Sequence, residues 1–566
     1  MDKRMLLSNL DLLATAPDGV TKLRELILTL AVQGKLVPQD PADESASVLL
    51  QKIRAEKDRL IAEGKIKRDK PLAEIAEEEK PFELPQGWEW ARCDDYFLEL
   101  CTGPFGSMIH QEDYVRDGVP LINPSHMVGG RIIHDPRVTI KAADAERLSA
   151  YALSVGDMVL ARRGEVGRYA YVTQQEHGWL CGTGSFFVRL YSQCNREYLG
   201  LIFSDVRFRQ HLQGESVGTT MTNLNQRILL NALLALPPLA EQSRIVTRVE
   251  TLMRLCDALE AKGQLEAAQH AQLVSTLLGT LTASTTPEEL ADHWQRVAQH
   301  FDLLLDRPEA IDALEQTLLQ LAVRGLLVPQ DPTDEPASAL LQKIRAEKDR
   351  LIATGQIKRD KPLPPITDEE KPFELPVGWV WVRLRDLVTH LGDGLHGTPN
   401  YSLTGDYYFV NGNNLGSGVI TIKPETKRVD RTEYEKHRKP LDDTTVLLSI
   451  NGTLGRVAFY QNEMIVLGKS ACYFNVTVGL QKIFAKLLLE CPDFMTYAEM
   501  SATGTTIKNL GLKAIGDWPI ALPPLAEQSR IVTRVTALRR LCADLRQRLA
   551  ERQSVQARLA EALLIH

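Results

Sequence analysis

A stretch of 14 residues occurs twice in this chain, letter for letter: residues 236–249, which read LPPLAEQSRIVTRV, return as residues 522–535. Two prolines followed by a glutamate are typical of a helix start. Proline is tolerated in the first turn, and an acidic side chain is favourable at the positive end of the helix dipole. A verbatim repeat indicates that the chain is built from two copies of one unit.

Behind each helix start, the apolar residues recur at alternating spacings of four and three. Such a narrow stripe is typical of a helix that packs on another helix. We expect each copy to pack on the other, or on the helix that follows Lys262 and Gly263. A helix on the core of its own domain can show the same pattern, but that interpretation explains a verbatim duplicate less well. The positions predicted to pack on a partner helix are Ile245, Val249, Leu252, Leu259, Ile531, Val535, Leu538 and Leu545.

A longer repeated block extends the unit towards the N-terminus. Residues 31–72 return as 322–363, and the match continues to Trp90 and its counterpart Trp381. The segments between the matched blocks share almost no residues. They contain short β-branched and aromatic runs separated by glycine and asparagine turns, followed by helical stretches, which predicts an α+β fold with many exposed loops.

The repeat predicts six regions. They are a helical region over 1–90, a first inserted domain over 91–230, a central helical region over 231–300, a repeated helical region over 301–381, a second inserted domain over 382–516 and a C-terminal helix over 517–566. Faint similarities survive between the inserts, because 163–168 resembles 451–456 and 218–224 resembles 504–510. We therefore expect one fold that carries different loops in its two copies.

Composition narrows the class of protein. The chain has 44% hydrophobic and 25% charged residues, and no apolar run approaches the roughly 20 residues of a membrane span. Without a signal-peptide pattern at the N-terminus, we expect a cytoplasmic protein. The eight cysteines form no C-x-x-C pair, so neither a disulfide framework nor a zinc site is predicted. A net charge of -7 argues against coating nucleic acid by charge alone, but not against local basic surfaces.

Catalytic motifs are missing from the sequence. Residues 468–470 end like a phosphate-binding P-loop, but Glu463 stands where the opening glycine belongs. Residues 123–126 begin like the N-P-P-aromatic motif of amino-methyltransferases, but they lack the second proline and the aromatic residue. No H-E-x-x-H or G-x-S-x-G motif is present. The sequence therefore favours a binding protein with no metal and no cofactor of its own.

The two inserts differ in the polar residues that they offer. The first is rich in arginine, whose planar fork can bind guanine O6 and N7; the second is rich in asparagine, which can bind adenine N6 and N7. Two Gly-Thr-Thr loops offer hydroxyls and amides to phosphates. Candidate DNA contacts are Thr102, Gly103, Ser107, Arg162, Arg163, Arg168, Thr219, Thr220 and Asn223 in the first insert, and His396, Asn411, Asn413, Asn451, Arg456, Lys469, Thr505, Thr506 and Lys508 in the second. Surface arginines and Asn-Gly turns also occur without any ligand.

The duplicated PPLAEQ helices, the Gly-Trp-x-Trp motifs at 87–90 and 378–381, and the two dissimilar inserts resemble the DNA-specificity subunit of type I restriction-modification enzymes over essentially the whole chain. The resemblance implies two target-recognition domains held apart by long antiparallel, coiled-coil-like helices, with pseudo-twofold symmetry. Each domain would read one half of an asymmetric bipartite site. A helix over 239–262 would span roughly 36 Å, about one turn of B-DNA, so the central helix is predicted to set the gap between the half-sites.

The resemblance also implies a non-catalytic subunit whose partners are double-stranded DNA, two adenine methyltransferase (modification) subunits and two restriction subunits with translocase and nuclease activity. S-adenosylmethionine, ATP and magnesium would be bound by those partners. Two other hypotheses stay open. One is a self-contained modification and restriction enzyme, which the missing motifs disfavour; the other is a helical adaptor of a different defence complex, with inserts that bind protein.

Overall fold

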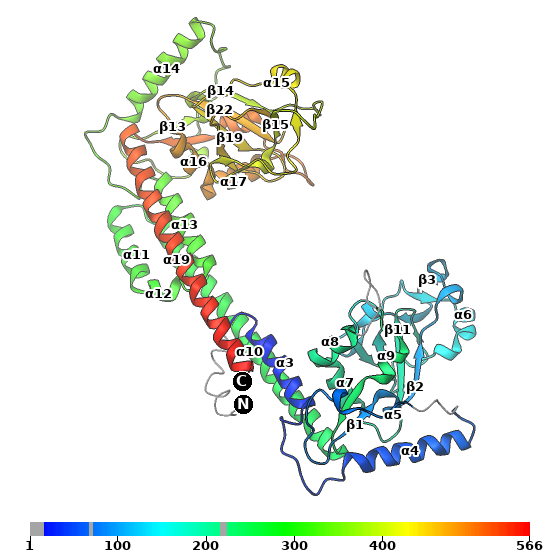
Figure 1. Ribbon diagram of the computed structural model, residues 1–566. Coiled ribbons are helices and arrows are strands. Elements are labelled where there is room, and N and C mark those ends of the chain that lie inside the picture. Colours follow the sequence, from blue (N-terminus) through cyan, green and yellow to red (C-terminus); the bar gives the residue numbers. More distant parts are fainter. Residues whose placement is uncertain (1–15, 67–71, 215–222, 566) are drawn as a thin grey trace. The chain divides into compact units, whose positions relative to one another are not determined.

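The computed structural model describes residues 16–66, 72–214 and 223–565 (Figure 1). The chain forms two compact units. Unit 1 consists of Met1–Leu265 with Gln553–His566, and unit 2 consists of Glu266–Arg552. Each unit contains one copy of the repeat. Two long helices, α10 (Leu239–Ala283) and α19 (Leu525–Ile565), contribute residues to both units.

Each repeat has a framework into which its variable domain is inserted. In unit 1 the framework elements are α3 (Gly19–Val32), α4 (Ala46–Ala62), the 3-10 helix η1 (Glu77–Glu79), β1 (Glu89–Arg92), β12 (Leu233–Leu236) and α10. In unit 2 they are α13 (Pro308–Val323), α14 (Ala337–Ala353), η6 (Asp368–Glu370), β13 (Val380–Arg383), β23 (Pro519–Leu522) and α19. Strands β1 and β12 pair antiparallel, as do β13 and β23. This pairing holds the two ends of each insert together, so the sequence between them can change without disturbing the framework.

The inserts share a fold although they share almost no sequence. The first has an antiparallel sheet in the order β2-β11-β8-β9 and a second sheet in the order β10-β4-β7-β3, where β10 and β4 are parallel. The second insert repeats this with β14-β22-β19-β20 and β18-β15-β21, where β15 and β21 are parallel. The strands of the first insert are β2 (Phe97–Thr102), β3 (Tyr114–Val115), β4 (Val119–Ile122), β7 (Thr139–Ile140), β8 (Met158–Ala161), β9 (Tyr169–Tyr171), β10 (Leu180–Cys181) and β11 (Ser185–Leu190). Those of the second are β14 (Val388–Asp393), β15 (Tyr407–Val410), β18 (Arg428–Val429), β19 (Thr445–Ser449), β20 (Val457–Phe459), β21 (Ile465–Leu467) and β22 (Ala471–Val476). The predicted α+β character of the inserts is confirmed.

Each insert shares a core with its framework helices. The insert helices are α7 (Arg196–Ser204) and α8 (Val206–Gly214) in unit 1, and α16 (Lys482–Glu490) and α17 (Pro492–Ser501) in unit 2. In unit 1, Ile245 and Val249 of α10 lie in one buried cluster with Ile27 of α3 and Phe203 of α7. The start of α10 is thus fixed directly to the insert of its own repeat. Ile531 and Val535 of α19 hold the same place in the core of unit 2.

The stripe of the first copy packs on a helix that sequence reasoning did not name. Arg24 of α3 forms ion pairs with Asp257 at 2.7 Å and with Glu260 at 2.8 Å of α10, while Gln39, beyond the end of α3, lies 3.2 Å from Glu241 at the start of α10. These contacts make α3 and α10 antiparallel. Leu252 joins the same core and Leu259 is half-buried. The partner of this seam is therefore the first framework helix of the same repeat.

In unit 2, α19 packs on two helices. Leu538 and Leu545 pack against a buried cluster that contains residues of α13 and the last part of α10. Arg546 pairs with Asp312 at 2.6 Å and Arg539 with Glu315 at 3.0 Å, which makes α19 antiparallel to α13, and Figure 1 shows the two side by side. The second copy thus packs partly on the residues that follow Lys262 and Gly263, which belong to the helix of the first copy.

Two details of the helix prediction were wrong. Lys262 and Gly263 do not end a helix, because α10 runs unbroken for 45 residues. One helical glycine costs about 1 kcal/mol relative to alanine, which is too little to break a helix that packs on both sides of it. The prolines also precede α10 rather than occupying its first turn, and the carbonyl of Pro238 accepts the N–H of Gln242 at 2.9 Å. Helices α11 (Pro287–Gln299) and α12 (Phe301–Leu304) then connect α10 to α13.

Candidate nucleic-acid interface

In each insert, the ends of several strands and the loops that follow them gather at one edge. In the second domain the N–H of Leu395 donates to Leu467 at 2.7 Å, that of Gly468 to Val410 at 2.8 Å, and that of Ile450 to Ser470 at 3.0 Å. These bonds place the loops after β14, β15, β19 and β21 next to one another. The predicted contacts that lie on these four loops are His396, Asn411, Asn413, Asn451, Arg456 and Lys469.

The first domain builds the same edge from different residues. The N–H of Gly103 donates to Ser185 at 3.0 Å, that of Gly182 to Ile122 at 2.9 Å, and that of Arg162 to Gly184 at 3.0 Å. A β-carbon on Gly103 would lie 2.0 Å from the carbonyl oxygen of Gly182, so only glycine permits this approach. Gly103 is buried and shapes the edge; it is not part of the exposed surface.

Each domain has two segments that resemble segments of the other repeat. Within each domain, these two segments are joined to each other by backbone hydrogen bonds. Arg163 forms a β-bridge with Asn223, and Asn451 forms the equivalent bridge with Asn509. The N–H of Leu224 donates to Arg162 at 2.8 Å, as that of Leu510 does to Ile450. In the second insert, the loop at 450–456 and the Gly-Thr-Thr segment are therefore parts of one surface, and in the first insert the arginine loop is bonded to Asn223 and Leu224 at the matching place. Predicted contacts Thr219 and Thr220 lie outside the described residues.

The Gly-Thr-Thr loop of the second domain is a tight projection. The backbones of Thr503 and Asn509 exchange hydrogen bonds of 2.9 and 2.8 Å, which closes the loop at its base. Gly504 has a φ of 96°, a value that side-chain-bearing residues rarely adopt. The loop exposes Thr505, Thr506 and Lys508, and the ammonium of Lys508 lies 3.7 Å from Glu499. Hydroxyls and one cation on a projecting loop suit contact with phosphates.

Arg162 is the most unusual of the predicted contacts. Its guanidinium lies over the ring of Phe186, 5.5 Å from the centroid, and its Nε is buried without a hydrogen-bond partner among the described residues. Burial, together with the neighbouring charge of Arg163, lowers the pKa of Arg162. A buried donor without a partner is costly, and a ligand that accepts its hydrogen bond would remove that cost.

The other two arginines of this loop differ in exposure and in the contacts of their side chains. Arg163 is exposed, whereas Arg168 forms an ion pair with Glu165 and donates to the carbonyl of Pro124 at 3.3 Å. Arg168 therefore ties two loops of the edge together. Thr102 is half-buried at the end of β2, and Ser107 lies in the short 3-10 helix η2 (Gly106–Met108).

In the second domain the predicted contacts also divide into exposed and structural residues. Asn413, Arg456 and Lys469 are exposed. The side-chain oxygen of Asn411 accepts the hydroxyl of Ser470 at 3.0 Å, so this acceptor is already used inside the domain. The remaining two predicted contacts are paired, because His396 lies 2.5 Å from Asp393 and the amide of Asn451 donates to Asn509 at 3.4 Å.

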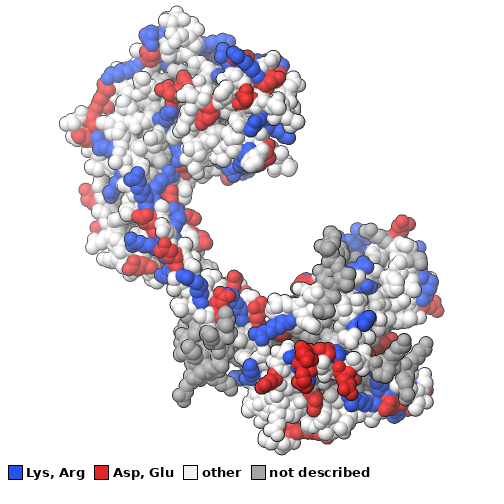
Figure 2. Space-filling model, viewed as in Figure 1, with Lys and Arg blue, Asp and Glu red and all other residues white. Residues whose placement is uncertain are grey.

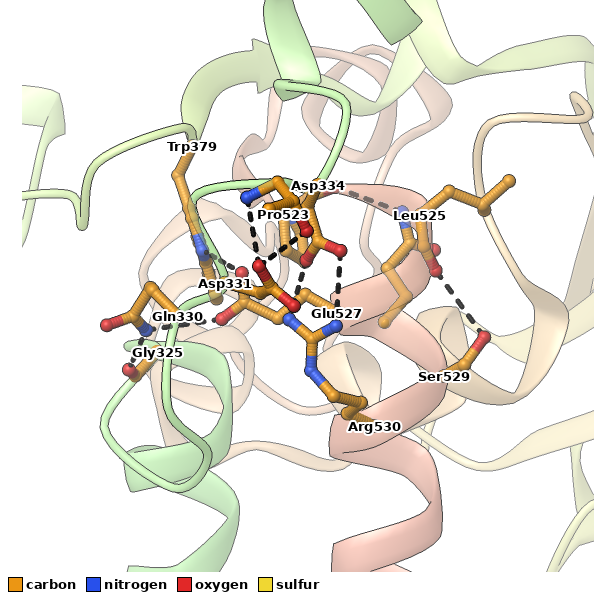
Figure 3. Close-up of polar contacts among 12 residues, drawn as sticks. Gly325, Gln330, Asp331, Asp334, Trp379, Pro523, Leu525, Glu527, Ser529 and Arg530 are labelled. Atoms are coloured by element: carbon orange, nitrogen blue, oxygen red, sulfur yellow. Dashed lines mark hydrogen bonds and ion pairs between the residues drawn. The ribbon is translucent and has the colours of Figure 1, made fainter.

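A buried polar cluster joins the framework segments of each unit to the start of its long helix, and Figure 3 shows the cluster of unit 2. In unit 2, Glu527 accepts hydrogen bonds from Trp379 Nε1 at 2.9 Å and from Gln330 Nε2 at 3.2 Å. Gln330 also donates to the carbonyl of Gly325 at 2.6 Å, and one turn along the helix Arg530 pairs with Asp334 at 2.6 Å. We call this cluster the lock of unit 2.

The lock of unit 1 is built from the matching residues. Glu241 accepts hydrogen bonds from Trp88 at 3.1 Å and from Gln39 at 3.2 Å, and Arg244 pairs with Asp43 at 2.5 Å. Burial raises the pKa of Glu241, as it does that of Glu527. The repeated PQDP segments at 38–41 and 329–332, the Gly-Trp-x-Trp motifs and the PPLAEQ motifs are thus three parts of one structure. Sequence reasoning missed this role, although the repetition of all three motifs was the signal for it.

Charged side chains of both signs are interspersed over the face of the molecule that Figure 2 shows. Neither unit presents one continuous basic surface on that face. Among the described residues, no helix is long and apolar enough to cross a membrane. No group of three histidine, cysteine or acidic side chains in the same residues could hold a metal ion.

These features define a class of protein: a tandem-duplicated α+β protein whose two domains present the same loop edge with different side chains. The family model described as "Type I restriction modification DNA specificity domain" matches residues 105–269 and 376–552, one stretch for each repeat. The chain is 35% identical over 563 residues to the EcoEI specificity subunit of Escherichia coli, covering 96% of this chain and 93% of that protein. It is 36% identical over 560 residues to the EcoAI specificity subunit of the same species, with the same two coverages.

This chain belongs to the family of type I restriction-modification DNA specificity subunits. Among solved structures, the HsdS subunit from Thermoanaerobacter tengcongensis is 19% identical, with a TM-score of 0.37, and the match covers 86% of this chain and 97% of that one. Membership of the family favours the specificity-subunit hypothesis over the helical adaptor and over the self-contained enzyme.

Proposed function

We propose that each insert reads one half of an asymmetric, bipartite DNA site, and that the loop edge is its reading surface. The observation that supports this most directly is the edge itself, built at the same place in both inserts by the same kind of backbone contacts. Its side chains differ: the first domain offers arginines, and the second offers amides, hydroxyls and lysines. One scaffold carrying two side-chain sets suits a site whose halves have different sequences.

The long helices would set the distance between the half-sites. In each unit the first framework helix runs antiparallel to the helix that follows the insert, as the contacts of Arg24 and Arg546 show. These contacts support a coiled-coil-like framework with pseudo-twofold symmetry. Because each long helix shares a core with its own insert, a change in helix length is expected to move the insert as well.

The chemistry would reside in other subunits. We propose two adenine methyltransferase subunits and two restriction subunits as partners of this non-catalytic chain in the cytoplasm. S-adenosylmethionine, ATP and magnesium would be bound by those partners. The missing catalytic motifs support this division of labour, as do the names of the two relatives, which are specificity subunits of type I restriction enzymes.

A domain exchange tests the proposal. The chain is co-expressed with its candidate methyltransferase subunit, and methylated adenines are mapped across genomic DNA by single-molecule sequencing. We expect a bipartite motif, one half of which changes when residues 93–230 are replaced by the insert of a relative, and the other half when 383–516 are replaced. An assembled complex that is supplied with methyl donor and methylates no such motif would contradict the proposal.

A further inference from the structure

A cavity lies at the same place in each repeat, between the framework and the insert helices. The cavity of unit 2 has a volume of about 440 Å³, and that of unit 1 about 240 Å³. In each, one wall comes from the framework and the other from the insert helices, α16 and α17 in unit 2 and α7 and α8 in unit 1. We call these cavities the Phe-Trp pockets, after the framework pair that lines each one.

The framework wall is nearly the same in both pockets. Phe82 and Trp90 lie with ring centroids 4.9 Å apart, and Phe373 and Trp381 lie 5.0 Å apart. Four other framework positions shared by the two pockets are identical as well: Val32 and Val323, Glu79 and Glu370, Pro81 and Pro372, Ala235 and Ala521; at a fifth, unit 1 has Leu233 and unit 2 has Pro519. The aromatic pair is half-buried, in contrast to Trp88 and Trp379, which the locks bury.

The insert wall differs between the two pockets. In unit 1 it includes Arg207, Phe208 and His211, and in unit 2 it includes Thr496 and Met500. The inserts have thus diverged around an unchanged aromatic pair. Contacts with the insert do not explain why the Phe-Trp pair is the same in both units, because the insert residues that line the two pockets are different. A partner that meets both repeats would encounter the same Phe-Trp wall twice.

An acidic turn borders each wall. In unit 2 it is η6, where Asp368 pairs with Lys371 at 2.6 Å and Glu370 with Arg383 at 3.0 Å. Glu369 between them is exposed, lines the pocket and forms no ion pair with any described residue. Asp493 lies on the opposite side and pairs at 3.4 Å with Arg324, whose guanidinium lies over the ring of Phe373; no lysine or arginine is among the described residues that line this pocket. Unit 1 places the corresponding turn, Glu77–Glu79, at the same position. The border of unit 2 complements a basic side chain, whereas the lining of the unit 1 pocket also contains Arg207.

We propose that the Phe-Trp pockets are docking sites for one protein partner that binds once per repeat. The partner would insert a large apolar side chain against the Phe-Trp pair and place a neighbouring lysine or arginine against the acidic turn. Aromatic side chains in partly desolvated pockets carry much of the binding energy of protein interfaces. The inference rests on the proposed function in one respect: the methyltransferase subunit is the partner expected in two copies.

Pocket-filling variants of the full chain test the docking inference. His211 in unit 1 and Thr496 in unit 2 are exposed residues of the insert wall. His211→Trp and Thr496→Trp should therefore fill the two pockets without changing any framework residue. Each variant should lose one bound methyltransferase subunit, and the double variant should lose both. Native mass spectrometry measures the number of subunits bound per chain. A filled pocket should bind the subunit on the order of thirtyfold more weakly. Matched controls are Gln210→Trp and Glu499→Trp, exposed residues of the same helices that do not line the pockets.

A spectroscopic measurement reports on the framework wall itself. The chain has seven tryptophans, which can be labelled with fluorotryptophan and assigned by single Trp→Phe variants. On addition of the methyltransferase subunit, the fluorine signals of Trp90 and Trp381 should shift, while those of the buried Trp88 and Trp379 should not. A second variant, Glu369→Lys, should weaken binding at unit 2 alone and leave the stability of the chain unchanged.

The outcomes separate the docking inference from the proposed function. A wild-type chain that binds no methyltransferase subunit contradicts the proposed function. A wild-type chain that binds two, with a double variant that also binds two at unchanged affinity, overturns the docking inference alone. Loss of self-association in the filled variants, in place of loss of the methyltransferase subunit, would assign the pockets to a second copy of this chain and overturn the inference as well.

Discussion

Glu241 and Glu527 join three motifs that are far apart in the sequence. Burying a carboxylate is unfavourable unless hydrogen bonds replace its lost water, and here an indole and an amide donate to each one. The repeated motifs are therefore explained by one acceptor and two donors. This is a structural role, and it accounts for the verbatim repetition without any catalytic function.

Replacing the acceptor tests the lock. Glu527→Ala leaves the indole N–H of Trp379 buried without a partner, so we expect a loss of stability of about 1–3 kcal/mol. Chemical unfolding followed by tryptophan fluorescence measures the loss. Thr533→Ala is a matched control, because the Thr533 hydroxyl is exposed and bonds only within its own helix, to Ser529. Equal losses in both variants would contradict the role assigned to Glu527.

The lock also predicts a pH dependence. Burial raises the pKa of Glu241 and Glu527 above the ordinary value of 4.5, so the folded state holds their protons more tightly than the unfolded state does. Their contribution to stability is full below pH 4.5 and is lost as the pH rises through the folded pKa. The double variant Glu241→Gln with Glu527→Gln should lose less stability than the wild type between pH 4.5 and neutrality. Urea unfolding at both pH values measures this, and identical losses would refute it.

Arg162 gives a prediction about recognition. Its partly buried fork lies over Phe186 and has a spare donor, whereas lysine would keep the charge and lose the planar geometry. We expect Arg162→Lys to relax base preference at one position of one half-site, by about 1–3 kcal/mol of discrimination, and to leave the other half unchanged. Methylome sequencing reads this directly. Arg131→Lys, at an exposed position of the same insert, is the control.

At the scale of elements, local periodicity located the helices well. Helix α4 (Ala46–Ala62) is an example, because the spacing of its apolar residues lies within the segment itself. The partner of α10 could not be found in this way. It is α3, more than 200 residues earlier in the chain, brought there by the pairing of β1 with β12. Likewise, the sequence identified Asn411 as polar and near a turn, but not that Ser470 would occupy its acceptor.

The packing of α3 on α10 differs from that of α13 on α19 in one respect. Arg24 pairs with Glu260 in the first repeat, and the matching positions in the second hold Glu315 and Arg546, which pair with the charges exchanged. The locks are built alike in both repeats, so they cannot determine which first framework helix packs on which long helix. The ion pair with exchanged charges can determine it, because packing α3 on α19 would place Arg24 next to Arg546. Like charges at such a contact are unfavourable, which favours the observed pairing of helices.

Gly263 provides the element-scale prediction. It lies inside α10, and a β-carbon added there would have no other atom within 4 Å, so a side chain at this position meets open space. Gly263→Ala should stabilise the helix by up to about 1 kcal/mol, and Gly263→Pro should destabilise it by about 3 kcal/mol. Thermal unfolding followed by circular dichroism measures both changes. If the chain bent at this glycine, alanine would destabilise it and proline would be tolerated.

At the scale of the whole molecule, α10 and α19 both pass from one unit to the other, between 265 and 266 and between 552 and 553. Inserting one heptad at each of these two points preserves the phase of the apolar stripe, because the stripe repeats every heptad. The insertion lengthens each helix by about 10 Å, equivalent to about three base pairs of B-DNA. We therefore expect the methylated motif to keep both half-sites and to widen its gap by about three base pairs, which methylome sequencing would show. An unchanged gap, from a complex shown to be assembled, would mean that the partner subunits set the spacing. Altered half-sites would mean that the long helices shape the reading edges and do more than separate them.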